Sequence, residues 1–285
     1  MTTSQSHRPK KSFGQHFLAD IRVAKTIAEE ATTPPGGTVL EIGAGEGALT
    51  THLLARAARV VAIERDRDLL PRLRETFADA IAEGRLVLIE ADAATADWSV
   101  VHDGPGPHVI AGNLPYSITG RLLSRTVGMA QEVDHAVFMI QKEVADRLIA
   151  PPDGDDYGAL SVFTQAAFDV SRVMIVRAGA FRPPPRVDSA VVRLDPLHPP
   201  RAVETDAFRE LVRRAFAARR KTLRNAWKGV FGWSAEELAG HAEACGVSLT
   251  ARGETLAVED FARLAALARD LAPEASVGGT ATEEP

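Results

Sequence analysis

Short runs of β-branched and aliphatic residues alternate with amphipathic stretches through the first two thirds of the chain. Five apolar runs have the length and composition of buried strands, at residues 38–42, 60–64, 86–90, 108–112 and 136–140. Between them, apolar positions recur with helical spacing, at residues 21–31, 47–57, 68–82 and 119–129. This alternation predicts an α/β domain with a doubly wound parallel sheet.

The alternation stops near residue 198. Two more β-rich runs, 170–176 and 189–194, precede this point and are joined by a proline-rich segment at 181–187. That segment must be extended, because proline fixes its own backbone and restricts the residue before it. Beyond residue 200 the strand signals disappear, and Ala, Leu, Arg and Glu recur with helical spacing.

These patterns predict four parts along the chain. They are a disordered N-terminus (1–11), an α/β domain (12–198), a small all-α domain (199–272) and a disordered tail (273–285). The two ends are polar and lack apolar positions with regular spacing, which is typical of disordered termini.

Composition limits the class of protein. With 45% hydrophobic and 25% charged residues, the 285-residue chain is typical of a globular protein. Its single cysteine, Cys245, excludes an intrachain disulfide and a cysteine-cluster metal site, and indicates a reducing compartment. No secretory signal and no run of about 18 apolar residues occurs. We expect a cytoplasmic protein with no membrane association and no metal.

Charge is unevenly distributed along the chain, whose net charge is −5. Residues 209–228 hold eight Lys or Arg and one Glu, whereas residues 235–285 hold ten acids and three bases. An acidic protein can still present a basic face to a phosphate backbone. On one helix, the basic positions of residues 209–228 would share a face, although such a run is also typical of a solvated helix surface. We expect Trp227 and Trp233 to pack in the core.

A glycine-rich turn follows the first predicted strand, in the sequence Val-Leu-Glu-Ile-Gly-Ala-Gly-Glu-Gly at residues 39–47. Glycines let the backbone approach a ligand closely at the start of a helix. The next strand ends in Glu64, where an acid commonly bonds both hydroxyls of a ribose. The third strand is followed by Asp92, whose carboxylate can accept from an adenine amino group. The pattern predicts a nucleoside-containing cofactor.

The glycine turn alone leaves the cofactor open. Gly43-x-Gly45-x-x-Ala48 also satisfies the permissive dinucleotide-binding pattern, which would indicate an NAD-dependent oxidoreductase. A tight turn without any ligand is a third interpretation. Glu41 favours S-adenosylmethionine, because a carboxylate beside the turn would repel a pyrophosphate and attract a cationic sulfonium.

The tetrapeptide Asn113-Leu114-Pro115-Tyr116 follows the fourth strand, at the sheet edge where α/β proteins bind ligands. An exocyclic adenine amine is a poor nucleophile, because its lone pair is delocalised into the ring. If the Asn113 side-chain oxygen and the Leu114 carbonyl accept its two hydrogens, the nitrogen can direct a lone pair at a methyl group. Pro115 lacks a backbone donor and stiffens the turn, and Tyr116 provides a ring for stacking of an extruded base. An ordinary strand-ending turn is the alternative.

Seven segments together resemble the KsgA-type family of ribosomal RNA adenine dimethyltransferases, over residues 11–271. They are Gly14-Gln15-His16-Phe17-Leu18, residues 41–47, 113–116, Gln141-Lys142-Glu143-Val144, residues 157–162, 181–189, and Arg219-Arg220-Lys221-Thr222. Three positions depart from the frequent family residues: Ala44 for proline, His16 for asparagine and Ser117 for asparagine. Only Ser117 bears on the shape of the target pocket.

The resemblance implies a Rossmann-like S-adenosylmethionine-dependent methyltransferase sheet with a small C-terminal all-α domain. It implies cofactor contacts from His16, Leu18, Gly43, Gly45, Glu64, Asp92 and Asn113. Residues 113–116 would hold the target adenine, with Phe181 stacking on its opposite face. The implied reaction is N6-dimethylation of two adjacent adenines near the 3′ end of small-subunit ribosomal RNA, late in subunit assembly.

The resemblance also favours a phosphate-binding role for the basic segment, through Arg213, Arg220, Lys221 and Arg224. The expected partners are small-subunit ribosomal RNA and the immature small subunit, bound by a monomer. An Erm-type methyltransferase, which modifies large-subunit ribosomal RNA and confers antibiotic resistance, shares the fold and chemistry. Segments 141–144 and 157–162 favour the KsgA-type interpretation. An RNA-binding assembly factor that methylates only incidentally is the non-enzymatic alternative.

Overall fold

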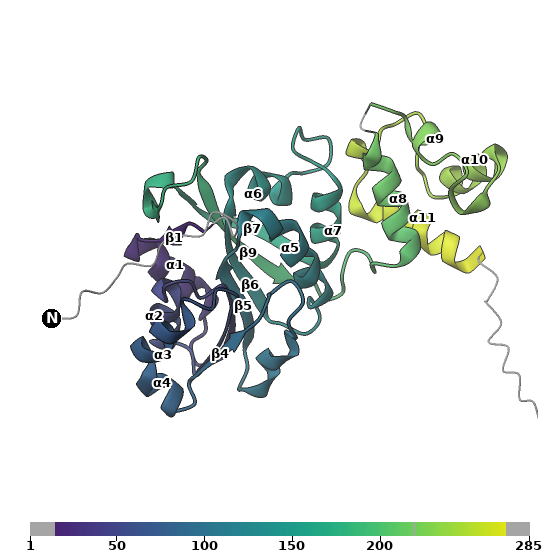
Figure 1. Ribbon diagram of the computed structural model, residues 1–285. Coiled ribbons are helices and arrows are strands. Elements are labelled where there is room, and N and C mark those ends of the chain that lie inside the picture. Colours follow the sequence, from purple (N-terminus) through teal and green to yellow (C-terminus); the bar gives the residue numbers. More distant parts are fainter. Residues whose placement is uncertain (1–14, 219, 272–285) are drawn as a thin grey trace, which may run out of the picture. The chain divides into compact units, whose positions relative to one another are not determined.

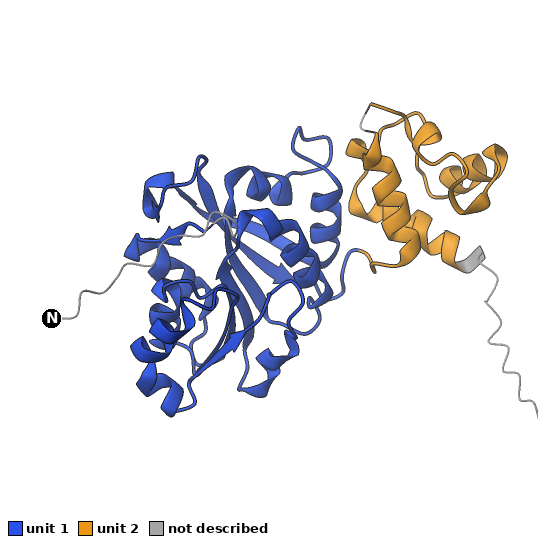
Figure 2. Cartoon of the chain, in the orientation of Figure 1, with its two compact units in different colours: residues 1–201 blue, residues 202–285 orange. Residues whose placement is uncertain are grey.

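The computed structural model describes residues 15–218 and 220–271 (Figure 1). The chain divides into two compact units, residues 1–201 and 202–285 (Figure 2). The predicted boundary after residue 198 falls close to this division. The predicted disordered segments, 1–11 and 273–285, lie outside the described residues.

A seven-stranded sheet with the order β4-β3-β2-β5-β6-β9-β7 forms the centre of the first unit. Its strands are β2 (Thr38–Ile42), β3 (Arg59–Glu64), β4 (Leu86–Glu90), β5 (His108–Asn113), β6 (His135–Gln141), β7 (Phe168–Val176) and β9 (Ser189–Pro196). Strands β2 to β6 are parallel, whereas β9 runs antiparallel to both β6 and β7. The chain leaves β2 toward β3 and later returns to β5 on its other side. This reversal point is where α/β sheets bind ligands.

Helices cover the first unit's sheet on both faces. They are α1 (Ile21–Ala31), α2 (Ala48–Leu54), α3 (Leu70–Thr76), α4 (Ala78–Ala82), α5 (Thr119–Gly128), α6 (Lys142–Ile149) and α7 (Ala159–Ala167). Alternate strand residues point to opposite faces. Val60 and Ala62 of β3 pack in the cluster that includes α1 and α2, whereas Val61 and Ile63 pack in the cluster that includes α5 and α6. The predicted Rossmann-like fold is confirmed, with a mixed rather than all-parallel sheet.

A two-stranded ribbon joins distant parts of the chain beside the sheet. Strand β1 (Phe17–Leu18) pairs antiparallel with β8 (Phe181–Arg182), the start of the proline-rich segment. The amides of Ala19 and Asp20 donate to the Ala180 carbonyl at 2.8 and 3.1 Å, and the Asp20 side chain caps α1. The N-terminal segment therefore enters α1 in a fixed position.

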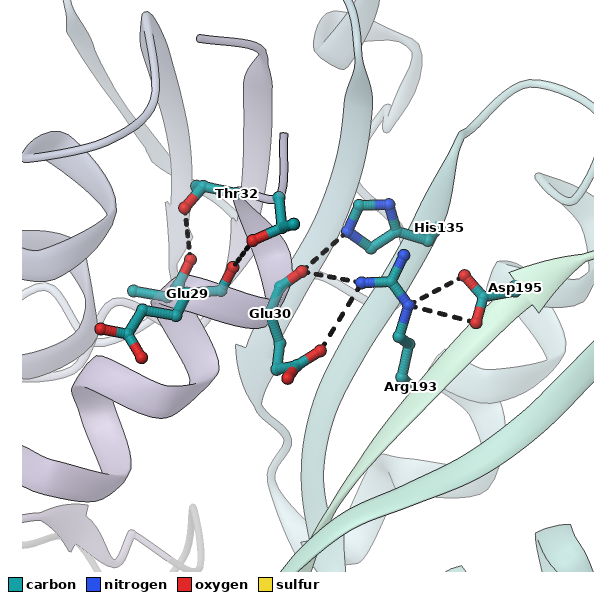
Figure 3. Close-up of polar contacts among 8 residues, drawn as sticks. Glu29, Glu30, Thr32, His135, Arg193 and Asp195 are labelled. Atoms are coloured by element: carbon teal, nitrogen blue, oxygen red, sulfur yellow. Dashed lines mark hydrogen bonds and ion pairs between the residues drawn. The ribbon is translucent and has the colours of Figure 1, made fainter. Parts of the chain in front are cut away.

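A polar cluster holds the other end of α1 against the sheet (Figure 3). The Glu30 carbonyl accepts from Arg193 Nη1 at 2.9 Å and from His135 Nε2 at 3.1 Å. Arg193 Nε also donates to Asp195 at 2.9 Å. A guanidinium at the carbonyl end of a helix complements the helix dipole. Burial lowers the pKa of His135, which keeps this imidazole neutral at physiological pH.

The second unit is all-α over its described residues, as predicted. Its helices are α8 (Asp206–Ala217), α9 (Leu223–Ala226), α10 (Ala235–Ala244) and α11 (Val258–Leu271). Trp227 is buried, donates from Nε1 to the Leu211 carbonyl at 2.9 Å, and packs edge-on against Phe261. Core packing of Trp227 is therefore confirmed. None of the described helices has the length and apolar composition needed to span a membrane.

The basic segment does not form one helix. Helix α8 ends at Ala217, and α9 begins only at Leu223. The prediction that the basic residues of 209–228 share one helical face is therefore wrong. The periodicity signal failed because it cannot register a short break between two helices that have similar composition.

Candidate active site

The glycine-rich turn after β2 contains three glycines whose backbone is in the left-handed region. Gly43, Gly45 and Gly47 have φ of 80°, 57° and 85°, values that favour glycine. Glu64, at the end of β3, accepts from the Gly45 amide at 2.8 Å through Oε2 and from the Asp66 amide at 2.7 Å through Oε1. The acid therefore fixes the turn to β3. A carboxylate oxygen can accept two hydrogen bonds. Each oxygen of Glu64 can therefore still accept a hydrogen bond from a hydroxyl group.

Glu41 lies behind the turn rather than in the site. Its side chain is fully buried, and Thr50 Oγ1 of α2 donates to its Oε2 at 2.7 Å. Burial raises the pKa of Glu41 to about 8, so that the group is mostly protonated at neutral pH. The argument that a Glu41 carboxylate attracts a cationic sulfonium is therefore wrong.

A cavity opens at the carboxyl edge of β2, β3, β4 and β5. Most of the predicted cofactor and catalytic residues line it: His16, Gly43, Gly45, Glu64, Asp92, Asn113, Leu114, Pro115 and Tyr116. Of the remaining lining residues, only Ser117 was related to the target pocket by the sequence; the others are Gln15, Phe17, Ile42, Ile63, Arg65, Ala91, Ala93 and Ile118. Most of them are immediate neighbours of predicted residues, and that adjacency was the available signal.

The Asn113 amide has a defined orientation. Its Nδ2 donates to the main-chain carbonyl of His16 at 3.1 Å, and no hydrogen bond to its Oδ1 occurs among the described residues. The Leu114 amide donates to the Met139 carbonyl at 3.0 Å, which continues the β5–β6 pairing into the tetrapeptide. The amide oxygen of Asn113 is therefore the end that can accept a hydrogen from a substrate amine.

The Tyr116 ring is held on two sides. It stacks on the His16 ring with centroids 5.7 Å apart and an interplanar angle of 28°. Its hydroxyl is 2.8 Å from Ser189 Oγ, at the start of β9. Burial raises the pKa of Tyr116, so the side chain remains a neutral phenol. These contacts give the cavity a rigid aromatic wall.

Two predicted residues do not line the cavity. Leu18 is 9% exposed and Phe181 is 2% exposed, and both belong to the core cluster that includes α1 and α2. The β1–β8 pairing places them opposite each other in register. Stacking of Phe181 on a base would require its ring to leave the core, so this role stays a prediction.

Asp92 is engaged by a residue that sequence reasoning missed. Its Oδ1 accepts from the Ala94 amide at 2.9 Å, and its Oδ2 is 3.1 Å from Arg65 Nη1. Arg65 directly follows Glu64 on the chain and also lines the cavity. The Arg65–Asp92 ion pair therefore spans the cavity edge between β3 and β4.

Comparison with known proteins identifies the family. A family model described as Ribosomal RNA adenine dimethylase matches residues 6–270. The chain belongs to this family. It uses S-adenosylmethionine to methylate adenine in ribosomal RNA, which excludes an NAD-dependent oxidoreductase and confirms the predicted resemblance.

Relatives of the dimethylase family match nearly the whole chain. Ribosomal RNA small subunit methyltransferase A of Geobacter metallireducens is 43% identical over 90% of this chain and 94% of its own length. The protein of the same name from Anaeromyxobacter sp. is 45% identical, over 90% and 92%. A dimethyladenosine transferase structure from Plasmodium falciparum aligns with a TM-score of 0.75 at 26% identity, over 87% and 96%. The 23S rRNA methyltransferase ErmE aligns with a TM-score of 0.64 at 28% identity, over 88% and 98%.

The basic residues predicted for this dimethylase's RNA surface lie on the second unit. Arg213, Arg220, Lys221 and Arg224 are exposed, and none forms an ion pair with an acid in the described part of the chain. Arg209 differs, because it pairs with Glu204 and Asp206.

Proposed function

We propose that this chain dimethylates N6 of two adjacent adenines near the 3′ end of small-subunit ribosomal RNA. The orientation of Asn113, with Nδ2 bonded to His16 and Oδ1 directed away from that bond, carries the proposal. Only an acceptor at this position can take a hydrogen from an adenine amine. Relatives named for the small subunit are 43–45% identical to this chain, whereas ErmE is 28% identical, which favours the small-subunit substrate.

The cavity residues fit S-adenosylmethionine. Glu64 lies at the end of β3 with spare acceptor capacity for ribose hydroxyls, and Asp92 can accept from the adenine amino group. The turn at Gly43 and Gly45 admits close approach of a ligand, and His16 lies opposite Asn113. The bound cofactor supplies an electrophilic methyl group on a sulfonium.

Residues 113–116 orient the target base. Asn113 Oδ1 and the Leu114 carbonyl accept the two amine hydrogens, so that the nitrogen lone pair is directed out of the ring's conjugation. Pro115 fixes the turn that presents the Leu114 carbonyl, and Tyr116 stacks on the extruded base. The amine needs no base beforehand, because its proton becomes acidic once the methyl has transferred and then leaves to water. Catalysis consists of positioning.

The second unit supplies RNA affinity. Arg213, Arg220, Lys221 and Arg224 are exposed cations, suited to phosphates of folded RNA without regard to sequence. The substrate is the immature small subunit, met in the cytoplasm by a monomeric enzyme. If the chain were instead an RNA-binding assembly factor that methylates only incidentally, the Asn113→Ala variant would still support subunit maturation.

The experiment is methyl transfer from labelled S-adenosylmethionine to immature small subunits, with large-subunit RNA as the competing substrate. We expect label in small-subunit RNA, with mass mapping that locates dimethyladenosine at two adjacent positions. Asn113→Ala serves as the inactive control. Label in large-subunit RNA instead would contradict the proposal and support the Erm-type alternative.

A second experiment tests the RNA surface. We expect the double variant Arg220→Ala/Lys221→Ala to weaken RNA binding and lower the salt slope by about 2, because each lost phosphate contact removes about one unit. Its S-adenosylmethionine affinity should not change. Arg209→Ala is the matched control, since Arg209 is already paired with Glu204 and Asp206. Equal slopes for all three proteins would contradict the assignment.

A further inference from the structure

Three aromatic rings lie in series on the second unit, between the 3-10 turn Val230–Gly232 and helix α10. The Phe231 and Trp233 rings meet edge to face, with centroids 5.0 Å apart at 74°. The Trp233 ring in turn contacts His241 of α10, with centroids 4.4 Å apart. Phe231 is 40% exposed, so it forms the open end of the series.

The backbone at Phe231 is strained. Its φ is +54°, in the left-handed region that non-glycine residues rarely adopt. Gly229 and Gly232, on either side, also have positive φ, at 68° and 78°. In this conformation the Phe231 side chain is 40% exposed while its ring still contacts Trp233. Strained residues of this kind are concentrated at binding sites.

Two exposed cations precede the exposed ring in the chain. Lys228 is three residues before Phe231, and Arg224 lies on α9 in the same unit (Figure 1). Both are exposed, and neither forms an ion pair with an acid among the described residues. Glu243 of α10 lines a shallow hollow together with Arg224 and is the one acid among the lining residues described for that hollow. A single exposed ring that follows exposed cations in the chain suits a nucleotide better than a protein partner, which needs a broad apolar patch.

We propose that Phe231 stacks on an unpaired base of the bound RNA, while Lys228 and Arg224 contact the adjoining phosphates. This inference rests on the RNA-binding role proposed above for the second unit. Every base has a π-face, so stacking requires no particular sequence. The contact with Trp233 already restricts the motion of the Phe231 ring. The ring therefore loses less conformational entropy when a base stacks on it.

The test compares two RNAs of equal length, a hairpin with an unpaired loop and a fully paired duplex. We expect Phe231→Asn to lower the affinity for the hairpin by about 5- to 150-fold, the range for loss of one stacked base. Its affinity for the duplex and its salt slope should stay unchanged, because no phosphate contact is lost. Phe231→Trp should retain hairpin affinity, and Lys228→Ala should lower the salt slope for both RNAs.

The melting temperature separates this role from a purely structural one, because loss of a structural ring would lower the melting temperature. Asparagine tolerates the left-handed region, so Phe231→Asn should melt at or above the wild-type temperature. The inference is overturned if Phe231→Asn binds the hairpin as tightly as the wild type. It is also overturned if the variant loses both RNAs equally and melts at a lower temperature. A wild-type chain that binds neither RNA would instead refute the RNA surface itself.

Discussion

Asn113 Nδ2 donates to the main-chain carbonyl of His16 across 97 positions of sequence, at 3.1 Å. This bond decides which end of the amide can meet the substrate, because an amide that donates on one side presents its oxygen on the other. His16 precedes the short strand β1, whose pairing with β8 fixes its position. The N-terminal segment therefore orients the residue proposed to act on the base.

Asn113→Asp tests this orientation. A carboxylate at this position has no hydrogen to donate to the His16 carbonyl, and its two oxygens would repel that carbonyl. We expect the single-turnover methylation rate to fall by about 100-fold or more, as when one preorganised polar contact to the transition state is lost. Near wild-type turnover in Asn113→Asp would contradict the orientation argument.

Ser189 is expected to position Tyr116. Ser189→Ala removes the partner of the Tyr116 hydroxyl, and Tyr116→Phe removes the same hydrogen bond from the other side. Each variant should lower the methylation rate by about 2- to 10-fold, the value of one neutral hydrogen bond. Because both lose one bond, the double variant should be no slower than the slower single variant. Additive losses would show that the two groups act independently.

Glu41 predicts a pH dependence of stability. Its folded pKa is about 8, whereas an ordinary glutamate has 4.5, so the folded chain holds a proton that the unfolded chain releases. The contribution to stability is therefore complete below pH 4.5 and is lost as pH rises toward 8, by at most about 1.4 kcal/mol per pH unit. Glu41→Gln should flatten the decline in the urea midpoint between pH 5 and 8. An unchanged slope would contradict the assignment.

We expect Arg65 to contribute to cofactor binding, because it lines the cavity and pairs with Asp92. Arg65→Leu removes the partner that holds Asp92 and should weaken S-adenosylmethionine binding by up to about 5-fold, the upper value for one surface ion pair. Arg67→Leu is the matched control, because Arg67 forms a similar pair with Glu90 and does not line the cavity. Calorimetry that gives equal losses for the two variants would refute a specific role for Arg65.

We expect a glycine to be required at position 112, because strands β5 and β2 lie too close together there for a side chain. A Cβ at Gly112 would lie 2.5 Å from the Ile42 carbonyl oxygen of β2. Gly112→Ala should lower the free energy of unfolding by about 1–3 kcal/mol, the usual cost of overpacking. A Cβ at Gly120 of α5 meets nothing within 4 Å, so Gly120→Ala should be neutral or stabilising. Equal stability of the two variants would contradict the packing argument.

The sequence alone predicted the edge of the sheet where the site lies. Glu64, Asp92 and Asn113 each end or follow a strand of the parallel part of the sheet. Because the carboxyl ends of parallel strands share one edge, strand order and type were sufficient to place these residues together. The glycine turn was equally predictable, because left-handed backbone positions favour glycine.

Only the tertiary structure decided the contacts between distant segments. It placed Phe181 in the core and paired β9 antiparallel to β6, and it separated α8 from α9 within the basic segment. It also directed Glu41 toward Thr50 rather than toward the cavity. Periodicity reports which face of a local element is apolar, whereas the partner that covers that face is chosen by packing across the whole chain. The Asn113–His16 bond is a contact of this second kind, so the motif was readable from the sequence and its orientation was not.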